Sequence, residues 1–250
     1  MIKTTGATLD AFKINIPLVI LSKTFQNAVD ICRRLKIYFL WIDAVCIIQD
    51  NPEDWKEEAG KMADIFENAF LTIAADSAKQ GSEGCYRTTN AIHLAQPVVD
   101  GTFVRAVPPE FSNCYRIFDQ HPLSNRGWVY QEMRLSRRIL HYRSDEVVWE
   151  CRCSINGESG KSEDLTKLAE YHGDEETILP VYNFTSYWKL ARAPRLSWYR
   201  TVQKYSRLQL SYESGRMIAI SALAQRMERL RGDGRYLAGL WEKTLLFDLL

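Results

Sequence analysis

Hydrophobic residues recur at helical spacing in two early segments of the chain. An apolar stripe runs to Lys36 after Ser22, a typical helix N-cap, so we predict a helix there. A second stripe extends from Asp54 to Ala69, after the turn signal Asn51-Pro52. The two stripes consist of Phe25, Ala28, Val29, Cys32 and Leu35, and of Trp55, Ala59, Met62, Phe66 and Ala69.

Two apolar runs without polar alternation flank the second of these helices. Residues 37–43 and 70–75 are rich in β-branched and aromatic side chains, which is typical of strands covered on both faces. Strand, helix and strand in this order predict a βαβ unit with a right-handed crossover. Asp43 closes the first run and Asp76 follows the second, at the carboxyl ends where open α/β sheets bind ligands. The alternative for Asp43 is a cap on the following turn.

The middle of the chain mixes strand and helix patterns. Weak alternation around Asp100-Gly101 predicts a β-hairpin over residues 97–107. A helix is expected from Ser124 to Leu135, followed by strands at residues 138–142 and 146–151. Residues 154–164 are rich in glycine, serine and charged side chains, which is typical of a linker or insertion.

The last part of the chain returns to helical spacing. Stripes running from Trp198 to Leu208 and from Met217 to Leu230 predict two helices. The apolar end, residues 236–250, is expected to pack on the rest. The elements together predict an α/β domain at residues 15–155 with a mostly parallel sheet flanked by helices. A linker or insertion at 156–180 and a helical C-terminal region at 181–250 follow it.

One helix carries an acid on its apolar face. Trp128, Glu132 and Leu135 fall at i, i+4 and i+7, so they share a face of the helix that starts near Gly127. Acidic side chains usually lie on the solvent-exposed face of an amphipathic helix. Glu132 is therefore either a functional group or one partner of a buried salt bridge to Arg126 or Arg137.

Composition excludes several classes of protein. The 250 residues are 46% hydrophobic and 25% charged with a net charge of +1, so the chain has no global field for nucleic acid or an anionic membrane. No apolar run approaches the ~20 residues of a membrane span, and no secretory signal is visible, so we expect a cytoplasmic protein. The six cysteines lack paired zinc spacing and are interpreted as free thiols, with no metal site. His141 has no evident triad partner in the sequence.

Several blocks resemble the fungal heterokaryon incompatibility (HET) domain. The blocks are residues 40–50, residues 62–66 with Ala69, residues 126–132, and residues 135–138, and their order and spacing make the signal specific. The resemblance implies a role in non-self recognition and programmed cell death. It also implies a distant relation to TIR domains, and hence a TIR-like (flavodoxin-like) fold. The family's first strand motif has no counterpart in residues 1–20, so we expect an N-terminally truncated domain.

The resemblance to TIR domains implies a catalytic role for Glu132 on this helix. Many TIR domains that cleave NAD carry Trp-Cys-x-x-Glu on a helix, and Trp128 to Glu132 has this spacing, with Val129 in place of the cysteine. The resemblance implies Glu132 as the catalytic carboxylate of an NAD glycohydrolase, with NAD as substrate and no bound cofactor. Burial beside Trp128 would raise the pKa of Glu132.

The remaining site residues follow from the same comparison. Asp43 is expected to bind a ribose hydroxyl, and Ser124 to N-cap the helix and leave its backbone donors open to an anion. Trp128 and Arg126 are placed in the same substrate-binding site. The partner is expected to be a second copy or another incompatibility protein. The alternatives are a non-enzymatic TIR-like module that only assembles, and a decayed, inactive paralogue.

Overall fold

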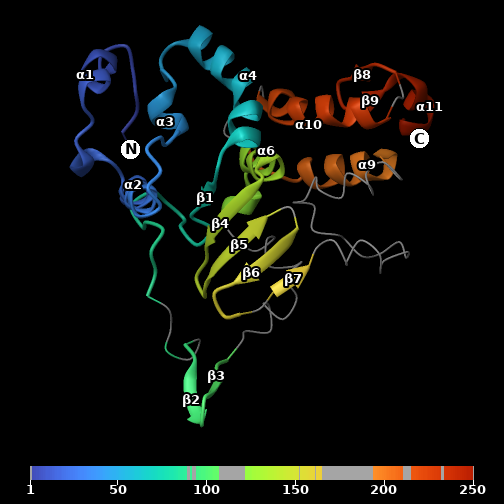
Figure 1. Ribbon diagram of the computed structural model, residues 1–250. Coiled ribbons are helices and arrows are strands. Elements are labelled where there is room, and N and C mark those ends of the chain that lie inside the picture. Colours follow the sequence, from blue (N-terminus) through green and yellow to red (C-terminus); the bar gives the residue numbers. More distant parts are fainter. Residues whose placement is uncertain are drawn as a thin grey trace.

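The computed structural model describes residues 2–88, 91, 94–106, 122–151, 153–160, 162–164, 194–210, 215–231 and 234–249 (Figure 1). Its N-terminal part is helical. The helices are α1 (Leu9–Ile14), α2 (Lys23–Arg34), α3 (Asp43–Cys46) and α4 (Pro52–Asn68), with a 3₁₀ turn at Leu18–Ile20.

Both predicted amphipathic helices of this part are confirmed. The Ser22 hydroxyl caps α2 by accepting a hydrogen bond from the Phe25 backbone NH, and Asn51 caps α4 by accepting from the NH groups of Glu53 and Asp54. Each helix buries the middle of its apolar stripe, with Ala28 and Cys32 in α2 and Ala59 and Met62 in α4, whereas Leu35 and Trp55 stay exposed. Pro52 stands at the first position of α4, where a proline costs no hydrogen bond.

The predicted strand at residues 37–43 is absent. This segment has no regular structure up to α3, and the side chains of Tyr38 and Phe39 are 89% and 92% exposed. The predicted βαβ unit is therefore wrong, and Asp43 begins a short helix instead of ending a strand. An apolar run of this length does not by itself distinguish a strand from an exposed segment, because it has no periodicity.

The sheet has five strands in the order β1-β4-β5-β6-β7. They are β1 (Thr72–Ala74), β4 (Arg138–Tyr142), β5 (Val147–Cys151), β6 (Ser154–Gly157) and β7 (Ser162–Asp164). Only β1 and β4 are parallel, and the other neighbours are antiparallel. The α/β class is thus confirmed, but the expectation of a mostly parallel sheet is wrong.

The antiparallel character arises from a stretch expected to be a linker. Residues 154–164 supply β6 and β7, which continue the sheet by short turns, and short turns join only antiparallel strands. The remainder of the predicted linker, residues 165–180, lies outside the described part of the chain. The separate hairpin of β2 (Gln96–Val99) and β3 (Thr102–Val104) confirms the predicted turn, with Gly101 at φ +75°.

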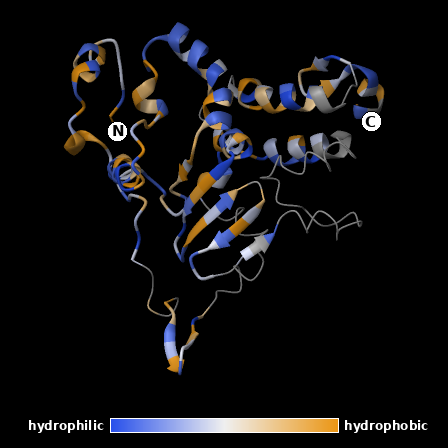
Figure 2. Ribbon diagram, in the orientation of Figure 1, coloured by the Kyte–Doolittle hydropathy of each residue, from blue (hydrophilic) through white to orange (hydrophobic). Residues whose placement is uncertain are grey.

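The hairpin and the C-terminal elements lie at opposite sides of the molecule. Figure 2 shows hydrophobic residues on the hairpin, which stands away from the body. The C-terminal elements are α9 (Pro194–Tyr205), α10 (Arg216–Arg231), the short pair β8 (Tyr236–Leu237) and β9 (Leu240–Trp241), a 3₁₀ turn at Glu242–Thr244, and α11 (Leu245–Asp248). The predicted packing of the apolar end is confirmed at Trp241, which is fully buried, and is wrong at Leu246 and Leu249, which are 83% and 66% exposed.

Helix α6 (Gly127–Leu135) lies at the centre of the molecule (Figure 1). One side of it contributes Tyr130 and Leu135 to the main core, together with α9 and α10. Another side places Val129 and Met133 on the sheet, against Ile139 and Val148. The segment with the acid on its apolar face is therefore packed between the sheet and the C-terminal helices.

Candidate functional site

The start of α6 differs from the prediction. Ser124 lies in a 3₁₀ turn at Pro122–Asn125, and Arg126 is the N-cap, without a side-chain capping bond. The chain therefore starts its helix two residues later than expected. The prediction that Ser124 caps α6 is therefore wrong.

The backbone at this terminus is joined to a distant segment. The Gly127 NH donates to the Gln209 carbonyl at 2.8 Å, and the Gln209 NH donates to the Asn125 carbonyl at 2.7 Å. A Cβ on Gly127 would lie 2.9 Å from side-chain atoms of Leu210. Glycine is required here by close packing, and the first backbone donor of α6 already has a partner.

Trp128 is partly buried against two other elements. Its ring meets the ring of Trp55 on α4 edge-to-face, with centroids 6.2 Å apart. A Cβ built on Gly215 would lie 3.6 Å from the same indole. Packing against α4 and the start of α10 therefore fixes the orientation of Trp128.

Glu132 lies one turn further along α6 and is partly buried. No hydrogen bond or ion pair within the described part of the chain reaches its carboxyl group, so neither Arg126 nor Arg137 forms the salt bridge that was the structural alternative. Burial, and then the negative charge of Asp43, raise its pKa to about 7, while Arg126 opposes the shift. Glu132 is thus an unpaired acid that titrates near neutral pH.

The structure brings Asp43 to Glu132 although the predicted strand is missing. Asp43 is the first residue of α3, and its Oδ1 accepts a hydrogen bond from the Ala44 NH at 2.7 Å. The N-cap of α3 is Ile42 and no side chain caps this helix, so the alternative role of Asp43 as a cap is not observed. Asp43 and the exposed Arg126 lie close enough for their charges to act on Glu132, in opposite directions.

An unpaired acid at this position is expected to destabilise the fold when it ionises. Folding raises the pKa of Glu132 from 4.5 to about 7. The resulting loss of folding stability is therefore absent below pH 4.5, grows as the pH rises, and is complete above about pH 7. We predict that Glu132→Gln raises the melting temperature at pH 8 but not at pH 4. Thermal unfolding of both proteins measures this.

The matched control is Glu57→Gln, because Glu57 is an exposed acid of α4 that pairs with Lys61. It should leave the melting temperature unchanged or slightly lower at pH 8. A lower melting temperature of Glu132→Gln at pH 8 would show that Glu132 is a structural ion-pair partner after all.

A second titratable cluster is fully buried between β1, β4 and β5. His141 Nδ1 lies 2.7 Å from Asp76 Oδ2, and His141 Nε2 lies 3.1 Å from Glu150 Oε2. Burial alone would lower the pKa of His141, but the two carboxylates outweigh it and raise the pKa to about 9. The imidazolium is held between two acids, which is a structural ion cluster and not an open site.

The sequence did not reveal this cluster. His141 was expected to lack partners, and Asp76 was expected at an open sheet edge, yet both side chains are less than 2% exposed. One feature of the sequence could have indicated the burial of His141. Alternate residues of a strand face the same side of the sheet, so His141 shares the buried side of β4 with Ile139. A buried polar residue requires a partner, but Asp76 is 65 residues away in sequence, and no local pattern identifies it.

Two cavities lie away from the carboxylate pair. The first, of about 450 Å³, is between α2 and β4. The second, of about 430 Å³, is between α4, α6 and α10, and is lined by Gln131. The Oε1 atom of Gln131 is buried and has no hydrogen-bond partner among the described residues. Gln131, the neighbour of Glu132 in sequence, thus lines a second cavity that is polar and does not include Glu132.

The five cysteines in the described part of the chain form no disulfide. Cys32, Cys46, Cys85, Cys151 and Cys153 are free thiols. Burial raises the pKa of Cys85 to about 11, so this thiol stays protonated and unreactive. None of the described helices is both long and apolar enough to cross a bilayer.

Comparison with known proteins confirms the resemblance. A family model for the heterokaryon incompatibility protein (HET) matches residues 3–132. No curated protein and no solved structure matches the chain, so the relation to TIR domains stays a prediction. The match begins before residue 15, the predicted start of the domain. Thr4 is buried there, and its NH donates to the Ala44 carbonyl at 2.9 Å.

Proposed function

The chain belongs to the heterokaryon incompatibility (HET) family, and from that premise we propose that it acts in non-self recognition and programmed cell death by cleaving NAD at Glu132. One observation carries the enzymatic part of this proposal. Glu132 is an unpaired carboxyl with a pKa near 7, next to a second carboxylate, in the segment where the family match ends. Strongly perturbed acids without structural partners are typical of functional sites.

The proposed reaction is hydrolysis of the nicotinamide–ribose bond. The bond between C1′ and the pyridinium nitrogen breaks, and its electron pair leaves with nicotinamide. The ribose then carries oxocarbenium-like positive charge, which the Glu132 carboxylate stabilises. Water adds to C1′ and releases a proton, so the products are nicotinamide and ADP-ribose.

The neighbouring residues have supporting roles in this proposal. Asp43 keeps the pKa of Glu132 raised and is suited to accept a hydrogen bond from a ribose hydroxyl. Arg126 is exposed at the N-cap of α6, where it can bind a phosphate. Trp128 supplies a fixed aromatic wall, and Ser124 lies in the preceding turn as a polar neighbour.

The experiment is to incubate purified protein with NAD and to follow nicotinamide release by wild type and by Glu132→Gln. Release by wild type alone supports the proposal. Equal release by both proteins would refute the role of Glu132, because the residual activity would come from another group.

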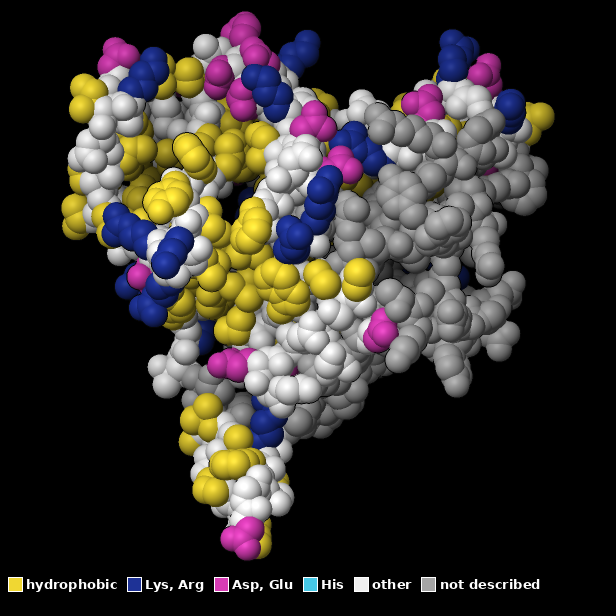
Figure 3. Space-filling view, viewed as in Figure 1, with side chains coloured by type: hydrophobic (Ala, Val, Ile, Leu, Met, Phe, Trp, Pro, Cys, Tyr) yellow, Lys and Arg dark blue, Asp and Glu magenta, His cyan; other side chains and the backbone are white. Residues whose placement is uncertain are grey.

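A second candidate function, self-assembly without catalysis, is favoured by a separate observation. Strand β1 is an edge of the sheet, and Phe70, two residues before it, is 67% exposed. Tyr38 and Phe39 are also exposed, in the segment between α2 and α3. Figure 3 shows hydrophobic side chains gathered across this face of the molecule. An exposed edge strand beside an apolar surface is a typical site of association.

We predict concentration-dependent self-association through this surface. Light scattering should show a rising average mass for wild type and for Glu132→Gln, whereas Phe39→Lys should stay monomeric because it places a charge in the interface. Leu246→Lys is the matched control, since Leu246 is 83% exposed in α11, at the far side of the molecule. A wild-type protein that is monomeric at every concentration would contradict this candidate.

A further inference from the structure

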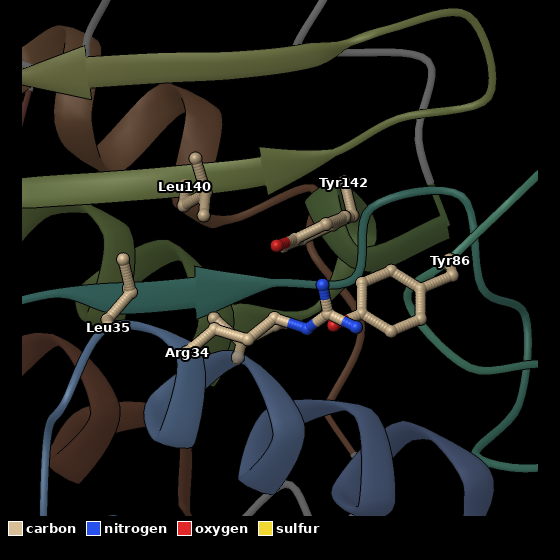
Figure 4. A pocket seen from close by; sticks show the side chains of 6 residues that line it. Arg34, Leu35, Tyr86, Leu140 and Tyr142 are labelled. Atoms are coloured by element: carbon tan, nitrogen blue, oxygen red, sulfur yellow. The ribbon is translucent and has the colours of Figure 1, made fainter.

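The cavity between α2 and β4 is open to solvent and combines apolar walls with a cation at its rim, Arg34, whose side chain is 75% exposed. Ile31 and Leu35 line it from the α2 side, and Leu140 from β4. Its volume of about 450 Å³ lies in the range of ~300–1,000 Å³ that is typical of small-molecule sites. Figure 4 shows Leu35 and Leu140 toward one end, and Arg34, Tyr86 and Tyr142 toward the other.

Arg34 is held in place by an acid and a phenol. Its Nε donates to Asp30 Oδ2 at 2.8 Å, one helical turn away, and the Tyr86 hydroxyl donates to the same oxygen at 2.6 Å. The two Nη groups of Arg34 make no hydrogen bond to any residue that the structure describes. The guanidinium is therefore oriented by one nitrogen, and its other donors are open to a ligand.

Tyr142 offers a further donor. Its hydroxyl points into the cavity and has no hydrogen-bond partner among the described residues (Figure 4). Its ring meets the ring of Tyr86 edge-to-face at 5.8 Å, which fixes its position. Burial raises the pKa of Tyr142, so the hydroxyl keeps its proton at neutral pH and can donate.

The charges at this end favour an anion. Arg33 lies close enough to Asp30 to lower the pKa of that carboxyl, after the larger effects of Tyr86 and Arg34. The positive charges of Arg34, which pairs with Asp30, and of the more distant Arg33 thus outnumber this one carboxylate. A cationic ligand would meet this excess of positive charge, and a neutral one would leave the Arg34 donors unused.

We propose that this cavity binds a small amphipathic anion, with its carboxylate on Arg34 and Tyr142 and its apolar chain between Leu35 and Leu140. The proposal is independent of NAD cleavage, because none of the lining residues belongs to the carboxylate pair of Asp43 and Glu132. It assigns a ligand-binding function to the face of the sheet that α2 covers.

The test is isothermal titration of the purified protein with three probes. Decanoate has both the carboxylate and the apolar chain, and acetate has only the carboxylate. Decyltrimethylammonium has the apolar chain with a positive charge. We expect saturable binding of decanoate alone, at concentrations below its micelle formation. Equal binding of decyltrimethylammonium would overturn the proposal, as would the absence of decanoate binding.

Two substitutions test the named contacts. Arg34→Met keeps an unbranched stem and removes the guanidinium, and it should weaken decanoate binding by at least about tenfold. Tyr142→Phe removes one hydroxyl and should weaken binding by roughly three- to tenfold.

The matched control is Arg33→Met, which changes the same residue type one position away and outside the cavity lining. It should bind decanoate within about threefold of wild type, since it removes only a more distant charge. Circular dichroism and thermal unfolding verify that each variant is folded. Wild-type affinity in a folded Arg34→Met protein would refute the assignment.

Discussion

Replacing His141 by glutamine is expected to lower the free energy of unfolding at pH 7 by about 3–5 kcal/mol. The imidazolium is the cation between two fully buried carboxylates, Asp76 and Glu150, at 2.7 Å and 3.1 Å. Its removal leaves like charges facing each other without a counterion. Urea denaturation followed by circular dichroism measures the loss, which is a large fraction of the ~5–15 kcal/mol that stabilises typical domains.

The pH dependence identifies the cluster as the cause. Because folding raises the pKa of His141 from 6.5 to about 9, its contribution is complete below pH 6.5 and is lost as the pH rises through about 9. The shift corresponds to about 3 kcal/mol of wild-type stability across that window. His141→Gln should lack this dependence.

The matched control for this experiment is Tyr142→Phe. Tyr142 is the next residue on β4 and faces the opposite side of the sheet, so the loss of its hydroxyl leaves the cluster intact. It should unfold within about 1 kcal/mol of wild type. A His141→Gln protein as stable as this control, with an unchanged pH profile, would show that the cluster is energetically neutral.

Glu132→Gln is expected to reduce NAD turnover by at least about 100-fold, as does the loss of one electrostatic stabiliser in other enzymes. Glutamine keeps the shape of the side chain and removes the charge that would face the developing oxocarbenium ion. Since the ionised form is the active one, wild-type kcat/KM should rise with pH through about 7, the pKa of Glu132 in the ligand-free protein. Steady-state assays from pH 5.5 to 8.5 measure both effects.

Glu57→Gln again serves as the control and should retain wild-type kcat, because Glu57 is exposed on α4. The decisive combination is loss of turnover together with a gain of stability at pH 8 in the same Glu132→Gln protein. A structural acid would show the reverse, since its replacement would weaken the fold.

Helices α2 and α4 were predictable because their information is local. The caps at Ser22 and Asn51 and the stripes behind them specify α2 and α4 without reference to the rest of the chain. The hairpin turn at Gly101 is local in the same sense, because a positive φ selects glycine.

The sheet was only partly predictable, because strand pairing is not local. The segment that contains Tyr38 and Phe39 has the composition of a buried strand, but it finds no neighbouring strand and remains exposed. Residues 154–164 have the composition of a loop, yet Ile155 is buried and pairs opposite Glu150. Tertiary context overrides β-propensity in both directions.

The positions of the candidate site residues were predictable only in part, and their roles stay a prediction. The spacing of Trp128 and Glu132 on one helix identified the acid, and its unpaired state agrees with a function. Asp43 was identified by a strand that does not exist, and it reaches the site by another route. Ser124 was misplaced because the helix starts two residues later, which a side-chain cap alone does not determine.

The most direct test of the central claim, that Glu132 is a catalytic carboxylate, is nicotinamide release from NAD measured by proton NMR at pH 8. Wild type and Glu57→Gln are predicted to release nicotinamide and ADP-ribose in equal amounts, while Glu132→Gln leaves NAD intact. Release by Glu132→Gln at the wild-type rate, or intact NAD with a folded wild-type protein, would contradict the claim.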